Sequence, residues 1–337
     1  MKLFRYLPAF AACVALQAVA QHPLDDLWFG TIRPPLAGGV TGQVQDRIFV
    51  GDNFQGLTYA DQDLFGRGNT PTLFYSVRRD AVSGQSFLST IATPVAPHFW
   101  PPHVVDEFAL GNGTYNELAF AAPDLTYGPV ILYDINTDGL SQQFGTINPS
   151  GAFTDNQFNV GAGTGFEALT FAETDVTFGA NLFYYLRTDL QGTHFGTIDP
   201  HQPGTVTDRW TLGLEGFYDS MVFTSTDVGY GANLFYFIRH DTTTDQHSFG
   251  TIDPLTGAAV DRFTIGTPFD NFTELSFTTT DVGYGANLFY YLRNTDTTDV
   301  PEAETFWAMG GVALVGGLWR LRAMRRAAKE NAAVSKG

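Results

Sequence analysis

The hydrophobic pattern of the chain consists of short runs of β-branched and aromatic residues, each bounded by Gly, Pro, Asp or Asn. Such runs predict β-strands, because branched and aromatic side chains fit a pleated surface while the flanking residues favour turns. Four signatures recur in a constant order, and each occurs five times at spacings of roughly 50–60 residues. A period of this length indicates an array of similar units.

The first signature is Phe-Gly-Thr-Ile, at Phe29, Phe144, Phe195 and Phe249, with a degenerate copy at Leu88. The second is Asp-Arg or a relative, at Asp46, Asp106, Asp155, Asp208 and Asp261. The third is a strand around a large apolar residue, at Leu57, Leu118, Leu169, Met221 and Leu275. The fourth is Leu-Phe-Tyr or a relative, at Leu73, Ile131, Leu182, Leu234 and Leu288.

Four short strands in a unit of about 50 residues predict one blade of a β-propeller. We expect the segment from Gly165 to be the innermost strand, followed by those at residues 181–187, 194–200 and 206–213. The second of these is nearly all apolar, as expected of a strand covered on both faces by neighbouring blades. The prediction is an all-β, five-bladed propeller over residues 21–299.

The phase of the repeat predicts how the ring closes. The body begins with third and fourth strands (residues 27–50) and ends with first and second strands (residues 272–293). Together these fragments complete one blade, a two-plus-two clasp that removes exposed sheet edges. A two-sheet sandwich of the same strands is the alternative, although a sandwich needs no regular period.

A fourteen-residue peptide occurs three times, beginning at Thr174, Thr226 and Thr280. Its Asp-Val-Gly-Tyr-Gly core, seen at Asp281, predicts a turn, because glycine permits positive φ and aspartate can cap its own turn. We therefore interpret the peptide as the hairpin that joins the two inner strands of a blade.

The amino terminus has the features of a secretory signal peptide over residues 1–20. Lys2 and Arg5 precede an apolar segment, and Ala18 and Ala20 form a small-x-small site for signal peptidase. Cys13, which a lipoprotein would use, is the only cysteine and lies inside this segment. The mature chain would then use no disulfide or thiol chemistry.

The carboxyl terminus combines a short motif, an apolar stretch at residues 305–319 and an arginine cluster. The motif is Val300, Pro301 and Glu302, and the arginines are Arg320, Arg322, Arg325 and Arg326. Residues 300–326 resemble the PEP-CTERM sorting signal. The resemblance implies an exported protein, held at the inner membrane until an exosortase-type protease cuts near the motif, and it also implies a transmembrane helix.

Two features depart from that resemblance. Ala303 stands where the family usually has a second proline, and a polar tail at residues 327–337 follows the arginines. The apolar stretch is also short, since a spanning helix needs about 20 residues. A plain membrane anchor, with its arginines on the cytoplasmic side, is the alternative.

The negative charge of the chain excludes some classes of binding partner. Residues 21–301 contain ten arginines, no lysine and 32 acidic residues. Such a surface repels phosphate backbones, so we expect no nucleic-acid partner. It favours cations, including calcium, although solubility outside the cell explains the same charge.

Two sets of polar residues are candidates for binding. The first lies two residues before each inner-strand apolar residue, at Gln55, Asn116, Glu167, Asp219 and Thr273. We expect these at one mouth of the channel, where oxygens could hold a cation or a sugar; hydration of the mouth is the alternative. The second set follows the second strand and pairs Arg187 with Asp189, Arg239 with Asp241 and Arg293 with Asp296. These pairs could form hydrogen bonds with sugar hydroxyls, or they could form ion pairs within their own loops.

Two further motifs are weaker candidates. Asp134, Asn136, Asp138 and Gln142 follow part of a calcium-loop spacing, but the twelfth position is Gly145 rather than glutamate. An Asp-Gly hairpin turn at Asp138 explains the same residues. Trp100 lies in a proline-rich insertion between His98 and His103, where its ring could stack on a sugar.

The chain lacks a G-x-S-x-G elbow, a P-loop, an H-E-x-x-H motif and a dinucleotide fingerprint. The sequence therefore favours a non-catalytic, exported binding or scaffold module at the cell surface or in the extracellular matrix, associated with polysaccharide. A glycan hydrolase using carboxylates at the channel mouth is one alternative. A structural coat protein without a ligand is the other.

Overall fold

The computed structural model describes residues 26–35, 42–51, 53–65, 73–94, 102–138, 141–162, 165–202, 204–213, 216–267 and 270–295. All of these belong to one compact unit, residues 25–295. The predicted signal peptide, the C-terminal sorting segment, Trp100 and Asp296 lie outside the described residues. Within the described part of the chain, no helix is long and apolar enough to cross a membrane.

The described strands form five antiparallel sheets of four strands each. Blade 1 contains β3 (Phe54–Ala60), β4 (Leu73–Arg79), β5 (Ser86–Ala92) and β6 (His103–Gly111). Blade 2 contains β7 (Thr114–Ala121), β8 (Ile131–Asp138), β9 (Ser141–Asn148) and β10 (Phe153–Ala162). Blade 3 contains β11 (Gly165–Ala172), β12 (Leu182–Asp189), β13 (Gly192–Ile198) and β14 (Val206–Thr211). Blade 4 contains β15 (Phe217–Thr224), β16 (Leu234–Asp241), β17 (Gln246–Ile252) and β18 (Ala259–Ile265).

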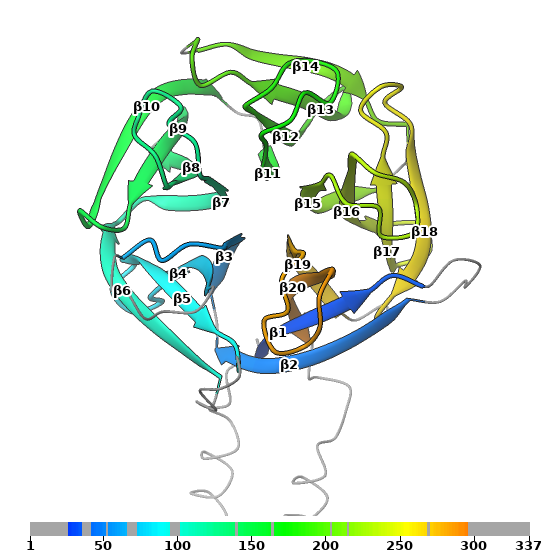
Figure 1. Cartoon of the computed structure of the whole chain (residues 1–337), viewed down its shortest axis with the longest axis horizontal. Coiled ribbons are helices and arrows are strands. Elements are labelled where there is room, and N and C mark those ends of the chain that lie inside the picture. The colour runs from blue at the N-terminus through cyan, green and yellow to red at the C-terminus, as the bar shows by residue number, and fades with distance from the viewer. Residues whose placement is uncertain are drawn as a thin grey trace, which may run out of the picture. The chain divides into compact units, whose positions relative to one another are not determined.

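Blade 5 joins the two ends of the described chain. It is built from β19 (Asp270–Thr278), β20 (Leu288–Thr295), β1 (Asp26–Arg33) and β2 (Gln43–Gly51). Strand β1 pairs with β20, so that Phe29 faces Leu292 in the register. Figure 1 shows the five sheets arranged around one axis, with β3, β7, β11, β15 and β19 innermost. The five-bladed propeller and its two-plus-two clasp are confirmed.

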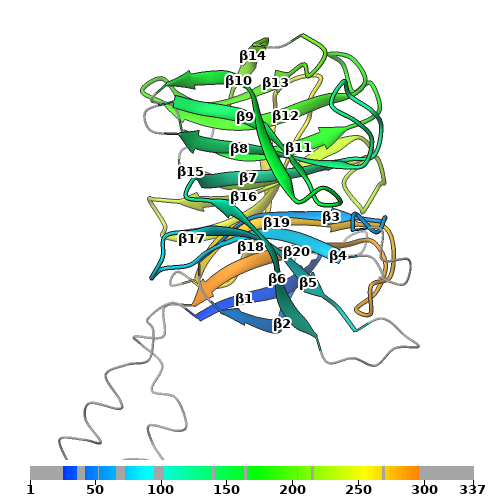
Figure 2. The same cartoon turned by 90° about the vertical axis from the view of Figure 1, so that its left-hand side faces the viewer.

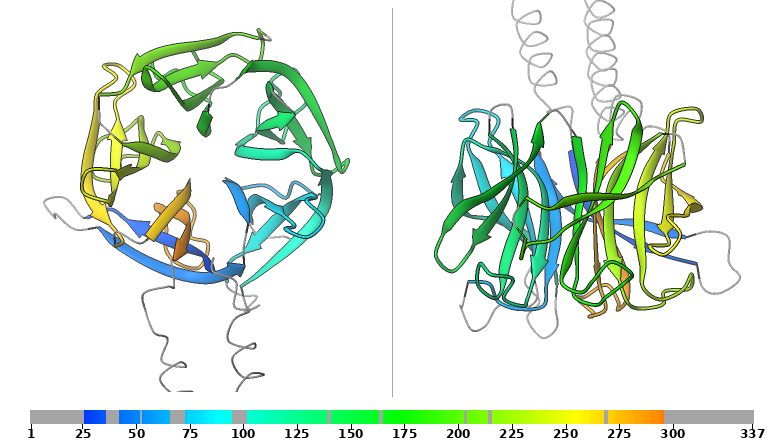
Figure 3. Two further views of the ribbon diagram at one scale, coloured as in Figure 1. Left: turned by 180° about the vertical axis from the view of Figure 1, so that it is seen from behind. Right: turned by 90° about the horizontal axis from the view of Figure 1, so that it is seen from above.

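Figure 2 shows the ring from the side, with β3 and β7 running along its axis, and Figure 3 shows it from behind and from above. The interfaces between blades are aromatic. Tyr184 of blade 3 lies 4.6 Å from Phe235 of blade 4, centroid to centroid, and Tyr236 of blade 4 lies 4.7 Å from Phe289 of blade 5. Fully burying one such ring contributes about 1.5–3 kcal/mol, and the paired geometry adds about 0.5–1.5 kcal/mol. The nearly apolar second strands therefore hold the blades together.

Packing explains why glycine recurs at the second position of the Phe-Gly-Thr-Ile signature. At Gly196 an added Cβ would overlap the ring of Tyr185, and it would lie 2.6 Å from the backbone oxygen of Thr207. Gly30 meets Tyr291 and Gly250 meets Phe237 in the same way. The third strand must carry glycine wherever the second strand lays an aromatic ring across it.

One predicted position in the Asp-Arg signature is wrong. In blade 3, Gly196 faces Asp208 in the register between β13 and β14. In blade 2 the residue that faces Gly145 is Asn156, not Asp155. Strands β10 and β14 carry an equivalent bulge at this point, so the difference lies in the sequence: Asn156 and Gln157 of blade 2 occupy the positions of Asp208 and Arg209 in blade 3.

The repeated hairpins are capped as the sequence predicts. Asp281 Oδ1 accepts hydrogen bonds from the backbone N–H groups of Gly283 and Gly285, both at 2.8 Å. Asp227 accepts equivalent bonds from Gly229 and Gly231 at 2.8 and 2.9 Å. The aspartate thereby satisfies the turn's own donors, which is why it recurs.

The last residue of this hairpin has left-handed backbone geometry and yields a stability prediction. Asn181, Asn233 and Asn287 have φ of 59°, 56° and 55°, whereas blade 2 has Val130 at φ 60°. Asparagine tolerates this region, but a β-branched residue is strained in it by about 1–2 kcal/mol. We expect Val130→Asn to raise the free energy of unfolding by about 1 kcal/mol. Urea denaturation measures this, with Asn233→Val as the reverse substitution; a loss of stability in Val130→Asn would contradict the strain.

Candidate binding site at one mouth of the central channel

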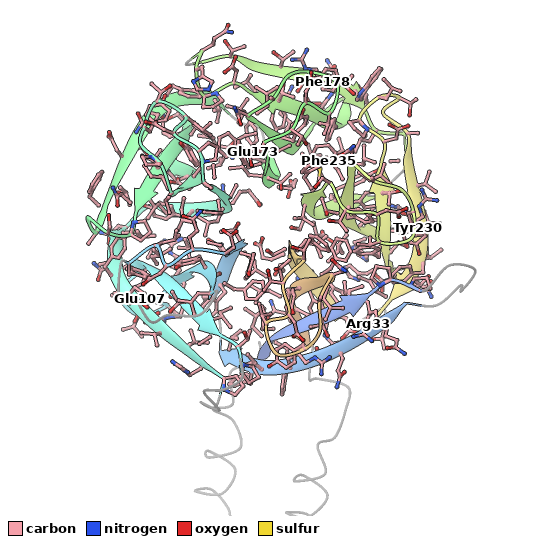
Figure 4. The ribbon with its side chains drawn as sticks, viewed as in Figure 1. Arg33, Glu107, Glu173, Phe178, Tyr230 and Phe235 are labelled. Atoms are coloured by element: carbon pink, nitrogen blue, oxygen red, sulfur yellow. The ribbon has the colours of Figure 1, made fainter. Side chains whose placement is uncertain are left out.

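The five innermost strands surround a channel with three successive cavities. One mouth has a cavity of about 470 Å³, the middle has about 120 Å³ and the opposite mouth has about 370 Å³. We call the first cavity the acidic mouth. Its polar lining is Asn53, Gln55, Asn116, Glu117, Glu167, Asp219, Asn271, Thr273, Glu274 and Asn294. Figure 4 shows side chains from all five blades around the centre of the ring.

The five predicted ring residues, Gln55, Asn116, Glu167, Asp219 and Thr273, all line this one cavity. A β-bulge in each innermost strand is responsible. In β11 the register jumps from Phe166 to Ala168 and leaves Glu167 unpaired. Strands β7, β15 and β19 do the same at their ring residues, whereas in β3 the unpaired residue is Gly56. Bulges re-aim a side chain, so the ring residues turn into the channel mouth.

Two acids of the acidic mouth were not predicted from the sequence. Glu117 and Glu274 lie one position after the ring residue and are only 7% and 6% exposed. Glu274 Oε1 accepts a hydrogen bond from the N–H of Gly56 at 2.7 Å, which links blade 5 to blade 1. Glu117 accepts a backbone hydrogen bond from Leu169 of blade 3. The available signal was glutamate next to a core leucine, a position where charge is otherwise costly.

The acids of the acidic mouth retain protons more strongly than exposed carboxyls do. Burial raises the pKa of Glu274 to about 8 and that of Asp219 to about 8. Burial, then the neighbouring Glu274 and Glu167, raises the pKa of Glu117 well above its usual value. Burial also raises the pKa of Glu167. At neutral pH the cavity therefore offers carboxylic acids that both donate and accept hydrogen bonds.

A buried histidine lies behind Asp219. Its Nε2 atom, on His247 of β17, is 3.6 Å from Asp219 Oδ2. Burial, followed by the charge of the stacked His240 ring, lowers the pKa of His247 to about 4. A neutral imidazole thus faces a largely protonated carboxyl, and neither is balanced by an arginine at this point.

No protein-family model matches this chain. No curated protein matches it either. Among solved structures, a chain of a nidogen/laminin complex is similar at 13% identity, with a TM-score of 0.41, over 79% of this chain and 84% of that one. TolB from Acinetobacter baumannii is similar at 12% identity, with a TM-score of 0.42, over 87% of this chain and 69% of that one. BBS1N in complex with ARL6DN shows 9% identity and a TM-score of 0.33, over 81% of this chain and 98% of that one.

The predicted arginine–acid pairs do not line the acidic mouth. Arg187 Nη1 lies 3.2 Å from Asp189, but the same side chain donates to both carboxylate oxygens of Asp208 on the outer strand. Arg239 binds Asp261 in the same way, and lies 3.5 Å from Asp241. These arginines tie the second strand to the fourth across the glycine of the third, which is a structural role.

The third arginine closes the clasp. Arg293 of β20 pairs with Asp46 of β2 and lies 2.7 Å from Asp270 of β19. Tyr291 also donates to Asp46, at 2.6 Å. Among the described residues the partners of Arg293 are therefore Asp46, from the other end of the chain, and Asp270, whereas the predicted partner Asp296 lies outside them.

The residues of the predicted calcium loop belong to two neighbouring strands, and residues 139–140 between them lie outside the described residues. Asp134 and Asn136 belong to β8, and Gln142 belongs to β9, where it faces Thr137. Asn136 donates to Asp134 Oδ1 at 2.6 Å and to Asn156 at 2.8 Å, and burial raises the pKa of Asp134 to about 7. Asp138 is the last residue of β8. Over the described ranges, no group of three or more His, Cys, Asp or Glu is placed to hold a metal ion.

Proposed function

We propose that this protein is an exported, non-catalytic binding or scaffold module that holds polysaccharide at the cell surface or in the extracellular matrix. The observation that carries the proposal is the convergence of five different polar residues, one from each blade, on a single cavity of about 470 Å³. A concave site with a few converging polar groups is the usual form of a small-ligand site.

The chemistry of the acidic mouth favours a neutral, hydroxyl-rich ligand. Protonated Asp219 and Glu274 donate as well as accept, and Gln55 and Asn116 supply amides. Among its described lining residues there is no arginine or lysine. An anionic polymer would lack a counter-charge here, so we propose a polysaccharide of neutral sugars.

Export rests on the two terminal signals. In this proposal signal peptidase cuts after Ala20, and an exosortase-type protease recognises residues 300–302 while residues 305–319 hold the chain in the inner membrane. The mature protein is then released to the cell surface or matrix. Intact-mass analysis of protein recovered from cells tests both cuts.

A glycan hydrolase is the second candidate, favoured by Asp219 and Glu167. Both line the same cavity, burial raises the pKa of both, and the charge of Glu167 raises the pKa of Asp219 further. A general acid needs a raised pKa of this kind. In that case Asp219→Asn would abolish hydrolysis outright rather than weaken binding.

A glycan array probed with the full-length protein, with calcium and then with a chelator, tests the proposal. We expect binding to one class of neutral polymer, weakened roughly two- to tenfold by Gln55→Ala, Glu167→Ala or Asp219→Ala, since each removes about one hydrogen bond. Glu173→Ala, at the opposite mouth, is the matched control. Loss of glycan binding in the presence of the chelator would indicate that binding requires calcium. A blank array in both conditions would overturn the sugar assignment and favour a coat protein.

A further inference from the structure

The mouth opposite the acidic mouth is lined by aromatic rings. One comes from each blade, two residues after the large apolar residue of the innermost strand. We call these five side chains, Tyr59, Phe120, Phe171, Phe223 and Phe277, the aromatic collar. All five line both the middle cavity of about 120 Å³ and the outer cavity of about 370 Å³. The collar therefore surrounds the channel at the point where the two cavities meet.

The collar is held in place by the core. Phe171 lies 5.1 Å from Phe183 and Phe223 lies 5.1 Å from Phe235, centroid to centroid. Phe277 and Tyr59 have the same kind of support from Phe289 and Phe74, at 4.8 and 5.2 Å. Each supporting ring is fully buried, while the collar residues stay partly exposed to the cavities. Because the rings are already positioned, a ligand would not have to order them on binding.

The charge around the collar is negative. The outer cavity adds Asp61 and Glu173, and none of its described lining residues is arginine or lysine. Figure 4 places Glu173 toward the centre of the ring, by β11. The face of an aromatic ring is also negative and attracts cations. The rings and the carboxylates therefore both favour a positively charged ligand.

We propose that the aromatic collar binds a quaternary ammonium group, such as the head of choline, in solution or on a lipid. Five aromatic side chains, one from each blade, line the cavity around the channel axis and suit a compact group, whereas a flat sugar ring would use only one or two of them. A primary ammonium is strongly hydrated and seeks hydrogen-bonded carboxylates, but Asp61 and Glu173 are exposed at the rim. A methylated cation needs no hydrogen bonds and gains from the rings directly.

Calorimetric titration of the full-length chain with choline tests this, against 3,3-dimethylbutan-1-ol, which has the same shape without the charge. We expect saturable binding of choline and at least tenfold weaker binding of the neutral alcohol. Equal affinity for the two would overturn the cation assignment. The absence of saturable choline binding would overturn the proposal. Saturable binding of glucose that Phe223→Leu with Phe277→Leu abolishes would also overturn it.

Variants locate the site. Phe223→Leu combined with Phe277→Leu keeps the side chains apolar but removes two aromatic rings from the cavity lining. This double substitution should weaken choline binding at least tenfold. Phe217→Leu, on the same strand as Phe223 and 57% exposed outside the cavity lining, is the matched control and should change nothing. Glu173→Gln should weaken choline binding two- to fivefold. A circular-dichroism melt shows that each variant folds.

Substitutions in the acidic mouth test whether choline binds there instead of at the aromatic collar. Glu117→Gln with Glu274→Gln should leave choline binding unchanged, because both residues lie in the other cavity. Loss of choline binding in that variant would place the cation at the acidic mouth and overturn the collar. Flotation with phosphatidylcholine vesicles against phosphatidylglycerol vesicles distinguishes a lipid source from a soluble one. Choline binding at the aromatic collar does not depend on polysaccharide binding at the acidic mouth, so the experiments can contradict one proposal without the other.

Discussion

Replacing Gly196 with alanine is expected to lower the free energy of unfolding by about 3 kcal/mol or more. The new Cβ would overlap the ring of Tyr185 and approach the backbone oxygen of Thr207 to 2.6 Å. Tyr185 cannot move easily, because it is fully buried and its hydroxyl donates to Asp208 at 2.6 Å. Urea denaturation of the variant measures the effect. Gly213→Ala is the matched control, since nothing lies within 4 Å of a Cβ added there.

Blade 1 shows how such a substitution can be accommodated. It carries Ser76 where blade 3 has Tyr185 and Ser89 where blade 3 has Gly196, and both serines are buried. We therefore expect Gly196→Ser and Tyr185→Ser together to cost less than the sum of the two single changes, by at least about 1 kcal/mol. Strictly additive costs would contradict the explanation that the ring excludes a side chain on the third strand.

The second large effect is a loss of stability as pH rises from 6.5 to 8. Glu274 and Asp219 have folded pKa values of about 8, far above those of exposed carboxyls. In this window the unfolded chain has released these protons and the folded chain still holds them. The unfolded state binds fewer protons, so the free energy of unfolding falls as pH rises. One pKa unit corresponds to about 1.4 kcal/mol, so the two groups together account for a loss of several kcal/mol.

His247 acts in the opposite direction at lower pH. Its folded pKa of about 4 lies below the ordinary value of 6.5, so its contribution is lost as pH falls from about 6.5 to 4. Above pH 6.5 only the acids contribute among these groups, which makes the window from 6.5 to 8 the informative one. Between about pH 4.5 and 6.5 the two acids outnumber the one histidine, so among these groups the free energy of unfolding is greatest near about pH 4.5.

Thermal melts of the wild type and Glu274→Gln between pH 5 and 8.5 test this prediction. Glutamine can still accept the hydrogen bond from Gly56 but carries no proton to release. We expect the variant to have a flatter pH profile and a higher melting temperature at pH 8 than the wild type. Glu173→Gln, at an exposed position, should follow the wild-type curve. An unchanged pH profile in Glu274→Gln would show that this acid is already ionised in the folded protein over this range.

The sequence alone determined the architecture and part of the acidic mouth. The four signatures, their fivefold recurrence and the phase at the chain ends predict five blades and the clasp, because strand patterning and turn residues act over a few positions. The same regularity located Gln55, Asn116, Glu167, Asp219 and Thr273, since equivalent positions in a closed ring face the same axis.

The tertiary structure decided the features that depend on contacts between distant segments. Arg293 pairs with Asp46 within the blade that joins the two chain ends, and Glu274 accepts a hydrogen bond from the backbone of Gly56 in the next blade. Asn156 rather than Asp155 lies opposite Gly145, and only the strand pairing shows which of the two is equivalent to Asp208 of blade 3. Each of these features depends on which distant segments pair or pack together, and local patterning does not specify that. Local patterning specifies the strands, whereas the burial that raises the pKa values of the acids exists only once the ring has closed.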